Sequence, residues 1–229
     1  LYAPKTSCGK YCFFHGANIG KKECYLCIMH PLEKMIGEGE HVRQDFKYFL
    51  NDARKIARSL AAFANTEGGR LLVGVKDNGR IAGLKHREEE AYVVEAAAHV
   101  FCRPPVRYTT RNWEHEGKVV LEVQVPKSTK APHSAPDESG KYLCYIRKGD
   151  ENKVASELET TVLKMTHSAR PLHFTLDNKH RRLLQVLGTQ TEYKEFDIAE
   201  LSRLSLMTRK ECIRALAGLI ASGTIQTSR

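Results

Sequence analysis

A switch from helix to strand in the middle of the chain constrains the fold more than any other feature. Residues 52–65 place apolar side chains, among them Ile56 and Leu60, at the spacing of a helix face. The glycine pair at 68–69 then supplies the backbone freedom that a helix C-terminus favours. The next residues, 71–75, are almost all apolar and predict a short strand. This part of the chain is therefore expected to combine helices with a sheet.

The segments after this switch continue the alternation. Asp77-Asn78-Gly79 is typical of a hairpin turn, and residues 81–84 are expected to form the returning strand. A second helix is predicted over 88–100, and strands are predicted over 119–125 and 142–147. Helices and hairpins in this order predict an α+β fold, in which helices flank a mixed or antiparallel sheet.

The C-terminal segment, residues 177–229, has the element order of a small winged helix-turn-helix. Helices are predicted over 179–188 and 196–204, and Thr208 with Glu211 fits a capping box that starts a third helix. A short strand is expected over 224–226. The exposed face of the third helix would meet phosphates or guanine edges through three basic residues: Arg209, Lys210 and Arg214. Because winged helices also mediate protein contacts, a protein-interaction module stays an alternative.

Composition limits the partners and the compartment. The 229 residues carry a formal charge of +9, which favours polyanions such as DNA or RNA, and a basic surface without that role is the alternative. Apolar runs are too short for a membrane span, and the first residues lack a signal-peptide pattern. We expect a cytoplasmic protein with four segments: 1–30, 31–155, a linker or helix over 156–176, and 177–229.

Seven cysteines are an odd number, and three of them stand alone, which argues against a disulfide framework and for a reducing compartment. The other four form a C-x3-C and a C-x2-C pattern near the N-terminus, close to the spacing of a zinc knuckle, with His15 and His30 as substitute ligands: Cys8, Cys12, Cys24 and Cys27. These four residues are therefore candidate zinc ligands, and a flexible tail with incidental thiols is the alternative.

Several motifs in residues 31–155 resemble the Schlafen/AlbA-like domain family, in its bacterial form with a C-terminal winged helix. Residues 40–47 read Glu-His-Val-Arg-Gln-Asp-Phe-Lys, 62–69 read Ala-Phe-Ala-Asn-Thr-Glu-Gly-Gly, and 74–77 read Gly-Val-Lys-Asp. Residues 145–149, Tyr-Ile-Arg-Lys-Gly, resemble the closing strand of the family. The resemblance implies a Schlafen AlbA-like sheet with flanking helices, action on nucleic acid and a homodimer.

The resemblance also implies a catalytic role for three acidic residues. Family members that cut transfer and ribosomal RNA carry carboxylates at the positions of Glu40, Asp45 and Asp77. Carboxylates brought together accept a divalent cation such as Mg²⁺ or Mn²⁺, which activates water and stabilises charge on phosphate. Asp45 stands where the family has Glu, which shortens the reach to a metal. Asp77 also suits a turn, and Glu40 a surface charge.

Basic residues around this motif are candidate phosphate contacts. Lys47 is expected either to contact phosphate or to pair with Asp45 and orient it. Arg54 and Arg58 are four residues apart and share one helical face, which is equally typical of a solvated surface. Relatives are often named ATP-binding, but the sequence has no Gly-x4-Gly-Lys-Ser/Thr loop to hold phosphates.

Three functions follow from these patterns. The leading hypothesis is a transcriptional regulator that binds DNA through a basic AlbA-like domain and a winged helix. The first alternative is a metal-dependent endoribonuclease that acts on structured RNA through the acidic trio. The second is the protein-interaction module.

Overall fold

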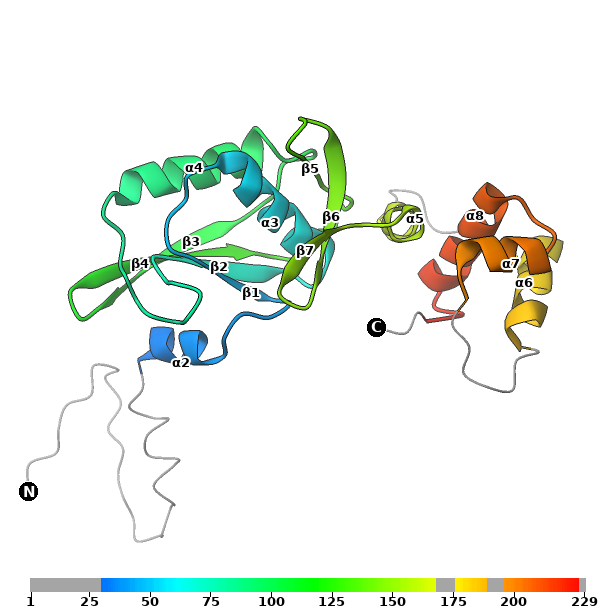
Figure 1. Cartoon of the computed structure of the whole chain (residues 1–229), viewed down its shortest axis with the longest axis horizontal. Coiled ribbons are helices and arrows are strands. Elements are labelled where there is room, and N and C mark those ends of the chain that lie inside the picture. Colours follow the sequence, from blue (N-terminus) through cyan, green and yellow to red (C-terminus); the bar gives the residue numbers. More distant parts are fainter. Residues whose placement is uncertain (1–29, 168–175, 189–195, 227–229) are drawn as a thin grey trace, which may run out of the picture.

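The computed structural model of the chain describes residues 30–167, 176–188 and 196–226. These residues form seven helices and two β-sheets, which confirms the predicted α+β class. Figure 1 shows the strands and their covering helices in one part of the chain and a group of helices at the other end. Among the described residues, no helix is long and apolar enough to cross a membrane.

The larger sheet has four strands in the order β1-β2-β4-β3. β1 (Gln44–Lys47) runs parallel to β2 (Gly69–Val73). β4 (Lys118–Val125) pairs antiparallel with both β2 and β3 (Thr109–His115). A parallel pair needs a crossover connection, and the helix between β1 and β2 provides it. Because β1 stands first in the strand order, it is an edge strand of this sheet.

Helices cover both faces of the larger sheet. On one face, α3 (Ala53–Asn65) and α4 (Arg87–His99) bury the main core, and the alternate apolar residues of β4 point toward them. On the other face, α2 (Pro31–Gly37) buries Leu32 against Phe46. In Figure 1, α3 and α4 lie above the sheet and α2 lies below it. The sheet thus forms the middle layer of this domain.

The turn from α3 to β2 is packed tightly. The backbone N–H of Gly68, which has a φ of +72°, donates to the carbonyl of Phe63 over 2.9 Å and closes the helix. A Cβ atom at Gly69 would lie 2.3 Å from the Phe63 ring. Both glycines are therefore required by the local backbone, as the sequence predicts.

A second, antiparallel sheet joins β5 (Ser134–Pro136), β6 (Tyr142–Lys148) and β7 (Glu151–Val154). The buried amide of Asn65, at the end of α3, fixes this sheet to the main core. Its nitrogen donates to the carbonyls of His133 and Tyr145, each over 2.8 Å, and its oxygen accepts from the His133 backbone N–H over 2.7 Å. Thr66 accepts a bond from the β6 backbone as well.

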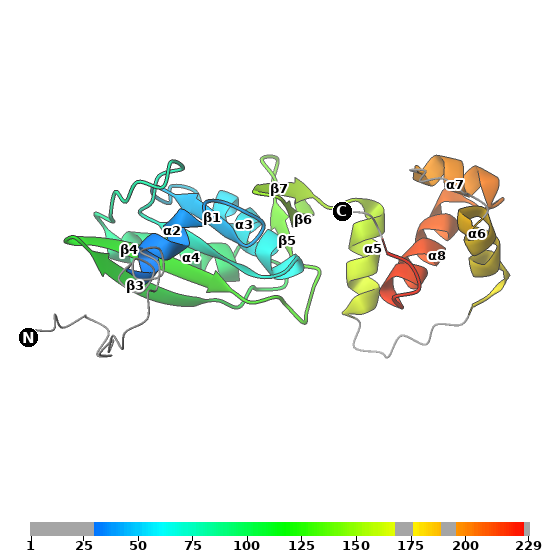
Figure 2. The ribbon, with the colours of Figure 1, turned by 90° about the horizontal axis from the view of Figure 1, so that it is seen from below.

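Four helices follow β7. They are α5 (Glu157–Thr166), α6 (Asn178–Gly188), α7 (Ile198–Leu204) and α8 (Arg209–Ala221). Helices α6 to α8 confirm the three predicted for this segment. Of the residues that would start the wing, 224 and 225 form a bend and 226 is irregular, so the strand predicted over 224–226 is wrong. Figure 2 shows α5 packed alongside α8, and Leu158 of α5 contacts the apolar cluster of α6 to α8.

The predicted strand at 81–84 is also wrong. The chain does turn back after Val75, but it makes only a single bridge, between Val75 and Ile81. The N–H groups of Ala82 and Gly83 both donate to the carbonyl of Gly74, so the ladder does not continue. Strands β1, β3, β5 and β7 escape prediction from pattern because they are short or largely polar.

Candidate functional site

Two of the three predicted catalytic carboxylates meet at the edge strand β1. The Glu40 carboxylate accepts the backbone N–H of Phe46 over 2.8 Å, and it lies within hydrogen-bonding reach of the Asp45 carboxyl group. Asp45 is only 5% exposed, and its neighbour Lys47 is partly buried, with 36% of its side chain exposed. The extended backbone of β1 puts Asp45 and Lys47 on the same face, away from Phe46. We call Glu40, Asp45, Lys47 and Arg147 the carboxylate junction.

Two cations compensate these carboxylates. The Lys47 Nζ lies 3.0 Å from Oδ1 and 2.9 Å from Oδ2 of Asp45. Arg147, from β6, is 4% exposed and donates to the carbonyls of His41 over 3.0 Å and of Gln44 over 3.3 Å. Its guanidinium also lies over the Phe63 ring. Arg147 therefore ties the second sheet to the edge of the first.

The electrostatics of the junction are those of a partly buried, charge-balanced group. Burial raises the pKa of the Glu40 carboxyl above its ordinary value of 4.5, and the nearby Asp45 raises it further. Burial lowers the pKa of Arg147, while the charges of Asp45 and Glu40 oppose that change. Within the junction, Lys47 and Asp45 form an ion pair, and the charge of Arg147 interacts with both carboxyl groups.

The third predicted carboxylate does not complete the site. Asp77 is exposed in the turn that follows β2, where the N–H of Gly79 donates to the carbonyl of Lys76 over 2.8 Å. Within the described ranges, no three His, Cys, Asp or Glu side chains form a group that could hold a metal ion. The structure therefore brings Glu40 and Asp45 together and leaves Asp77 apart. The Mg²⁺ or Mn²⁺ implied by the resemblance lacks its full ligand set in this arrangement.

The predicted zinc ligands lie outside the described residues: Cys8, Cys12, Cys24 and Cys27. Their metal binding stays a prediction. The three isolated thiols, Cys102, Cys144 and Cys212, are buried and free, and burial raises the pKa of Cys102 to about 12. A thiol of that pKa is an unreactive core residue.

The predicted phosphate contacts of the AlbA-like domain differ in their surroundings. Lys47 pairs with Asp45, as one of its two interpretations requires. Arg58 is half-buried and its Nε donates to the carbonyl of Pro136 over 2.9 Å, so it fixes β5. Arg54 is exposed and lies over the Phe101 ring. Of these three residues, Arg54 is the most open to a ligand.

The first turn of α8 presents its cations differently. Thr208 caps the helix, and its Oγ1 accepts the N–H of Glu211 over 3.3 Å. Arg209, Lys210 and Arg214 are all exposed, and Arg209 approaches Glu157 of α5 to 3.5 Å. The rest of α8 is buried against its neighbours, so only its beginning is open to a partner.

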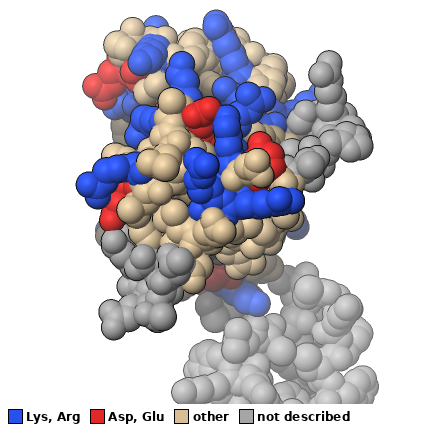
Figure 3. Space-filling model, turned by 90° about the vertical axis from the view of Figure 1, so that its right-hand side faces the viewer, with Lys and Arg blue, Asp and Glu red and all other residues tan. Residues whose placement is uncertain are grey.

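The surface of α6 to α8 is rich in cations. In residues 176–188 and 196–226, seven Lys and Arg accompany four Asp and Glu. Figure 3 views this end of the molecule and shows Lys and Arg spread over it with few acidic residues between them. The exposed cations are Lys179, Arg181, Arg182, Arg203, Arg209, Lys210 and Arg214. Such a surface attracts a polyanion.

Sequence reasoning missed the importance of Arg147. It counted this residue only as part of a motif, yet Arg147 is the buried cation that ties the second sheet to the backbone beside the two carboxyl groups. A signal was available in the sequence. An arginine inside a strand that is otherwise apolar and aromatic is expected to pair with an acidic or carbonyl group, because an unpaired buried charge is costly.

The fold and the site together define a class of protein. It has a two-sheet α+β domain with a pair of carboxyl groups beside two cations, followed by a basic helical unit. A family model described as Schlafen, AlbA_2 matches residues 40–156, just over half of the 229 residues. The chain belongs to the Schlafen AlbA_2 family. This membership indicates a nucleic-acid-related function.

Two solved structures are similar to the chain. The DIP2311 protein from Corynebacterium diphtheriae is 18% identical with a TM-score of 0.45, and the match covers 70% of this chain and 40% of that protein. The N-terminal domain of a RecG-related protein from Nitrosomonas europaea is 23% identical with a TM-score of 0.36, and the match covers 56% of this chain and 97% of that domain. The chain therefore spans less than half of the Corynebacterium protein.

Proposed function

We propose that this protein is a DNA-binding regulator, and that the beginning of α8 is its main contact with duplex DNA. The observation that carries the proposal is the exposed start of α8, where Arg209 and Lys210 follow the capped helix N-terminus and Arg214 lies one turn further on. A helix N-terminus attracts phosphate through its free N–H groups and its dipole. Recognition helices contact base edges through their N-terminal residues.

The helical arrangement supports the same role. The turn between α7 and α8 is short, as in a helix-turn-helix, and α8 is the more exposed of the two at its start. The cationic surface of α6 to α8 supplies the sequence-independent attraction that precedes specific binding. The cations of the carboxylate junction lie beside carboxyl groups, so the junction supports this proposal less than the helical unit does.

The ribonuclease alternative has weaker support. It needs a metal between converging carboxylates, whereas Lys47 and Arg147 already compensate Glu40 and Asp45, and Asp77 is elsewhere. The protein-interaction alternative would leave the cations of α8 without a specific role. The homodimer and the cytoplasmic location stay predictions.

The test is the salt dependence of duplex DNA binding, measured by fluorescence anisotropy on the full chain. Replacement of Arg209, Lys210 and Arg214 together by Ala should weaken binding at least about tenfold and should lower the slope of log affinity against log salt by about 3, because each lost phosphate contact removes roughly one unit. The matched control replaces three exposed lysines of the AlbA-like domain by Ala: Lys127, Lys130 and Lys141.

The control variant should keep most of the affinity and of the slope. Equal losses in the two variants would mean that net charge alone drives binding, and the proposal for α8 would be wrong. Absence of binding by the wild-type protein at low salt would reject the DNA-binding proposal itself.

A further inference from the structure

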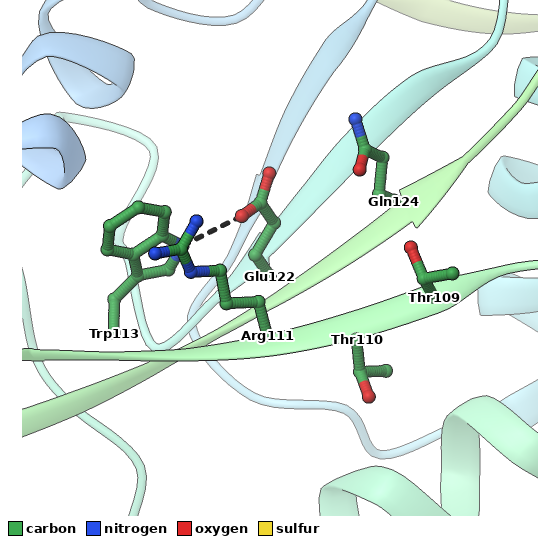
Figure 4. Close-up of a pocket in the computed structure, with 6 residues that line it drawn as sticks. All are labelled: Thr109, Thr110, Arg111, Trp113, Glu122 and Gln124. Atoms are coloured by element: carbon green, nitrogen blue, oxygen red, sulfur yellow. Dashed lines mark hydrogen bonds between the residues drawn. The ribbon is translucent and has the colours of Figure 1, made fainter.

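A hollow of about 440 Å³ lies on the larger sheet, on the face that carries α2 but beyond the part that α2 covers. Strands β3 and β4 form its floor. Figure 4 shows the six side chains around it: Thr109, Thr110, Arg111, Trp113, Glu122 and Gln124. It shares no residue with the carboxylate junction or with α8, and the function proposed above does not use it.

The planar guanidinium group of Arg111 forms one wall of the hollow. The guanidinium carbon of Arg111 lies 3.9 Å from the centre of the Trp113 ring, so the indole supports one face of the guanidinium. The Arg111 residue as a whole is exposed to the solvent. Figure 4 shows the guanidinium lying across the indole at the side of Glu122. A supported guanidinium plane is a surface on which unpaired bases stack.

A buried carboxylate, that of Glu122, lies at the floor of the hollow. Glu122 is 8% exposed, and one of its oxygens accepts the indole N–H of Trp113 over 2.7 Å. Over the described part of the chain, Glu122 is in no ion pair. A buried carboxylate is an acceptor with several lone pairs, and a single neutral donor leaves most of that capacity unused. The group is therefore suited to a ligand that brings N–H donors.

Polar side chains also lie beside Glu122 on the same face of the sheet. Gln124 follows two residues later on β4, on the same face of the sheet, and its register partner on β3 is Thr109. The amide of Gln124 is exposed and offers both a donor and an acceptor. A planar ligand on Arg111 would therefore have a carboxylate at one edge and an amide nearby.

We propose that this hollow binds an unpaired guanine base. Guanine is the only common base with two neighbouring N–H donors on its Watson–Crick edge, at N1 and N2, and a carboxylate accepts both at once. Adenine, cytosine and uracil each place an acceptor beside their donor, which would face the Glu122 oxygens and repel them. The Arg111 guanidinium covers one face of the base, while Gln124 is near enough in the sheet to meet its remaining polar groups.

The single tryptophan of the sequence makes the test direct. In the ¹⁵N-labelled full chain, the one indole N–H signal reports on the Trp113 bond to Glu122. Guanosine monophosphate should shift this signal in a saturable way. Inosine monophosphate, which lacks the 2-amino group, should bind at least about tenfold more weakly because one hydrogen bond to a charged group is lost. Adenosine monophosphate should bind more weakly still.

Glu122→Gln provides the decisive variant. Its side-chain carbonyl can still accept the indole N–H, so the fold and the signal position are expected to persist, but its amide N–H₂ replaces an acceptor. The preference for guanosine over inosine monophosphate should disappear. Glu114→Gln, an identical change at an exposed position of β3 outside the hollow, should keep the preference.

The base could belong to a free nucleotide or to a single-stranded nucleic acid. Two short single-stranded oligonucleotides, one with a guanine among adenines and one with adenines alone, distinguish these two ligands. Saturation by the free nucleotide identifies a mononucleotide site, and saturation only by the guanine-containing strand identifies a single-strand site. Equal shifts with guanosine and adenosine monophosphates, or an unchanged preference in Glu122→Gln, would overturn the proposal. Neither result depends on duplex binding by α8, so failure here leaves the DNA-binding proposal standing.

Discussion

The AlbA-like domain and the helical unit α6 to α8 both have an apolar core, but they differ in the range of their polar contacts. In the domain, buried polar side chains join residues that are far apart in the sequence. Asn65 reaches His133 and Tyr145, and Arg147 reaches the carbonyls that flank β1. These bonds are possible only when both sheets are in place, so they make the domain depend on its complete tertiary structure.

The helical unit uses contacts of shorter range. Apolar side chains such as Leu183, Leu201 and Leu219 form one cluster, and hydrogen bonds at helix starts are made within a few residues, as between Thr208 and Glu211. The two regions also differ in which of their charged groups are available to a partner. The charged groups of the carboxylate junction are used within the domain, whereas the cations of the helical unit lie on the surface.

The largest test of this comparison is Asn65→Ala. The change leaves two buried carbonyls and one buried N–H without their partner, so the free energy of unfolding of the domain should fall by about 3 kcal/mol or more. Urea denaturation followed by circular dichroism measures the loss, and the exposed Asn51→Ala serves as the control with almost no change expected. A loss below about 1 kcal/mol would show that these long-range bonds do not dominate the domain.

An intermediate effect is expected for Thr208→Ala. Loss of the N-cap of α8 should cost the helical unit about 1 kcal/mol, because the N–H of Glu211 loses its acceptor. Thermal unfolding of the helices measures it, with the exposed Thr129→Ala as a control. If the AlbA-like domain lost the same stability, the two regions would unfold together and the comparison would fail.

The smallest effect concerns the pH dependence of Glu40→Gln. Since burial and Asp45 raise the pKa of Glu40 above 4.5, the folded state holds this proton more tightly than the unfolded state does. Stability is therefore lost as pH rises from about 4.5 through the raised pKa, and Gln, which does not titrate, should remove that part of the curve. Unfolding by urea at several pH values checks it, beside Glu138→Gln. An unchanged curve would contradict the raised pKa.

Many local elements of both regions can be predicted from the sequence. The helix that ends at Asn65, the glycines after it and the capping box at Thr208 all follow from residues close in sequence, and all are present. The strand expected at 81–84 fails because one carbonyl, that of Gly74, takes both returning N–H groups. Such a choice depends on the backbone path and leaves no pattern in the residue types.

The candidate site is predicted only in part, for a related reason. The family resemblance singles out Glu40 and Asp45, and the structure places Asp45 in β1, where the backbone N–H of Phe46 donates to the Glu40 carboxylate. Asp77 also belongs to a motif, but the position of its side chain depends on an exposed turn. The roles of Arg147 and Glu122 arise from strands that are far apart in the chain or pair across the sheet, so pairing must be known before either role is visible.

The contact of α5 with α8 also fixes where the helical unit can be separated from the rest of the chain. Leu158 of α5 packs on the apolar cluster of the last three helices, and Ser156 caps α5 just after β7. A fragment that started at residue 177 would leave this side of α8 in water and would tend to self-associate. The shortest piece suited to independent expression, nuclear magnetic resonance and DNA titration therefore begins near Ser156.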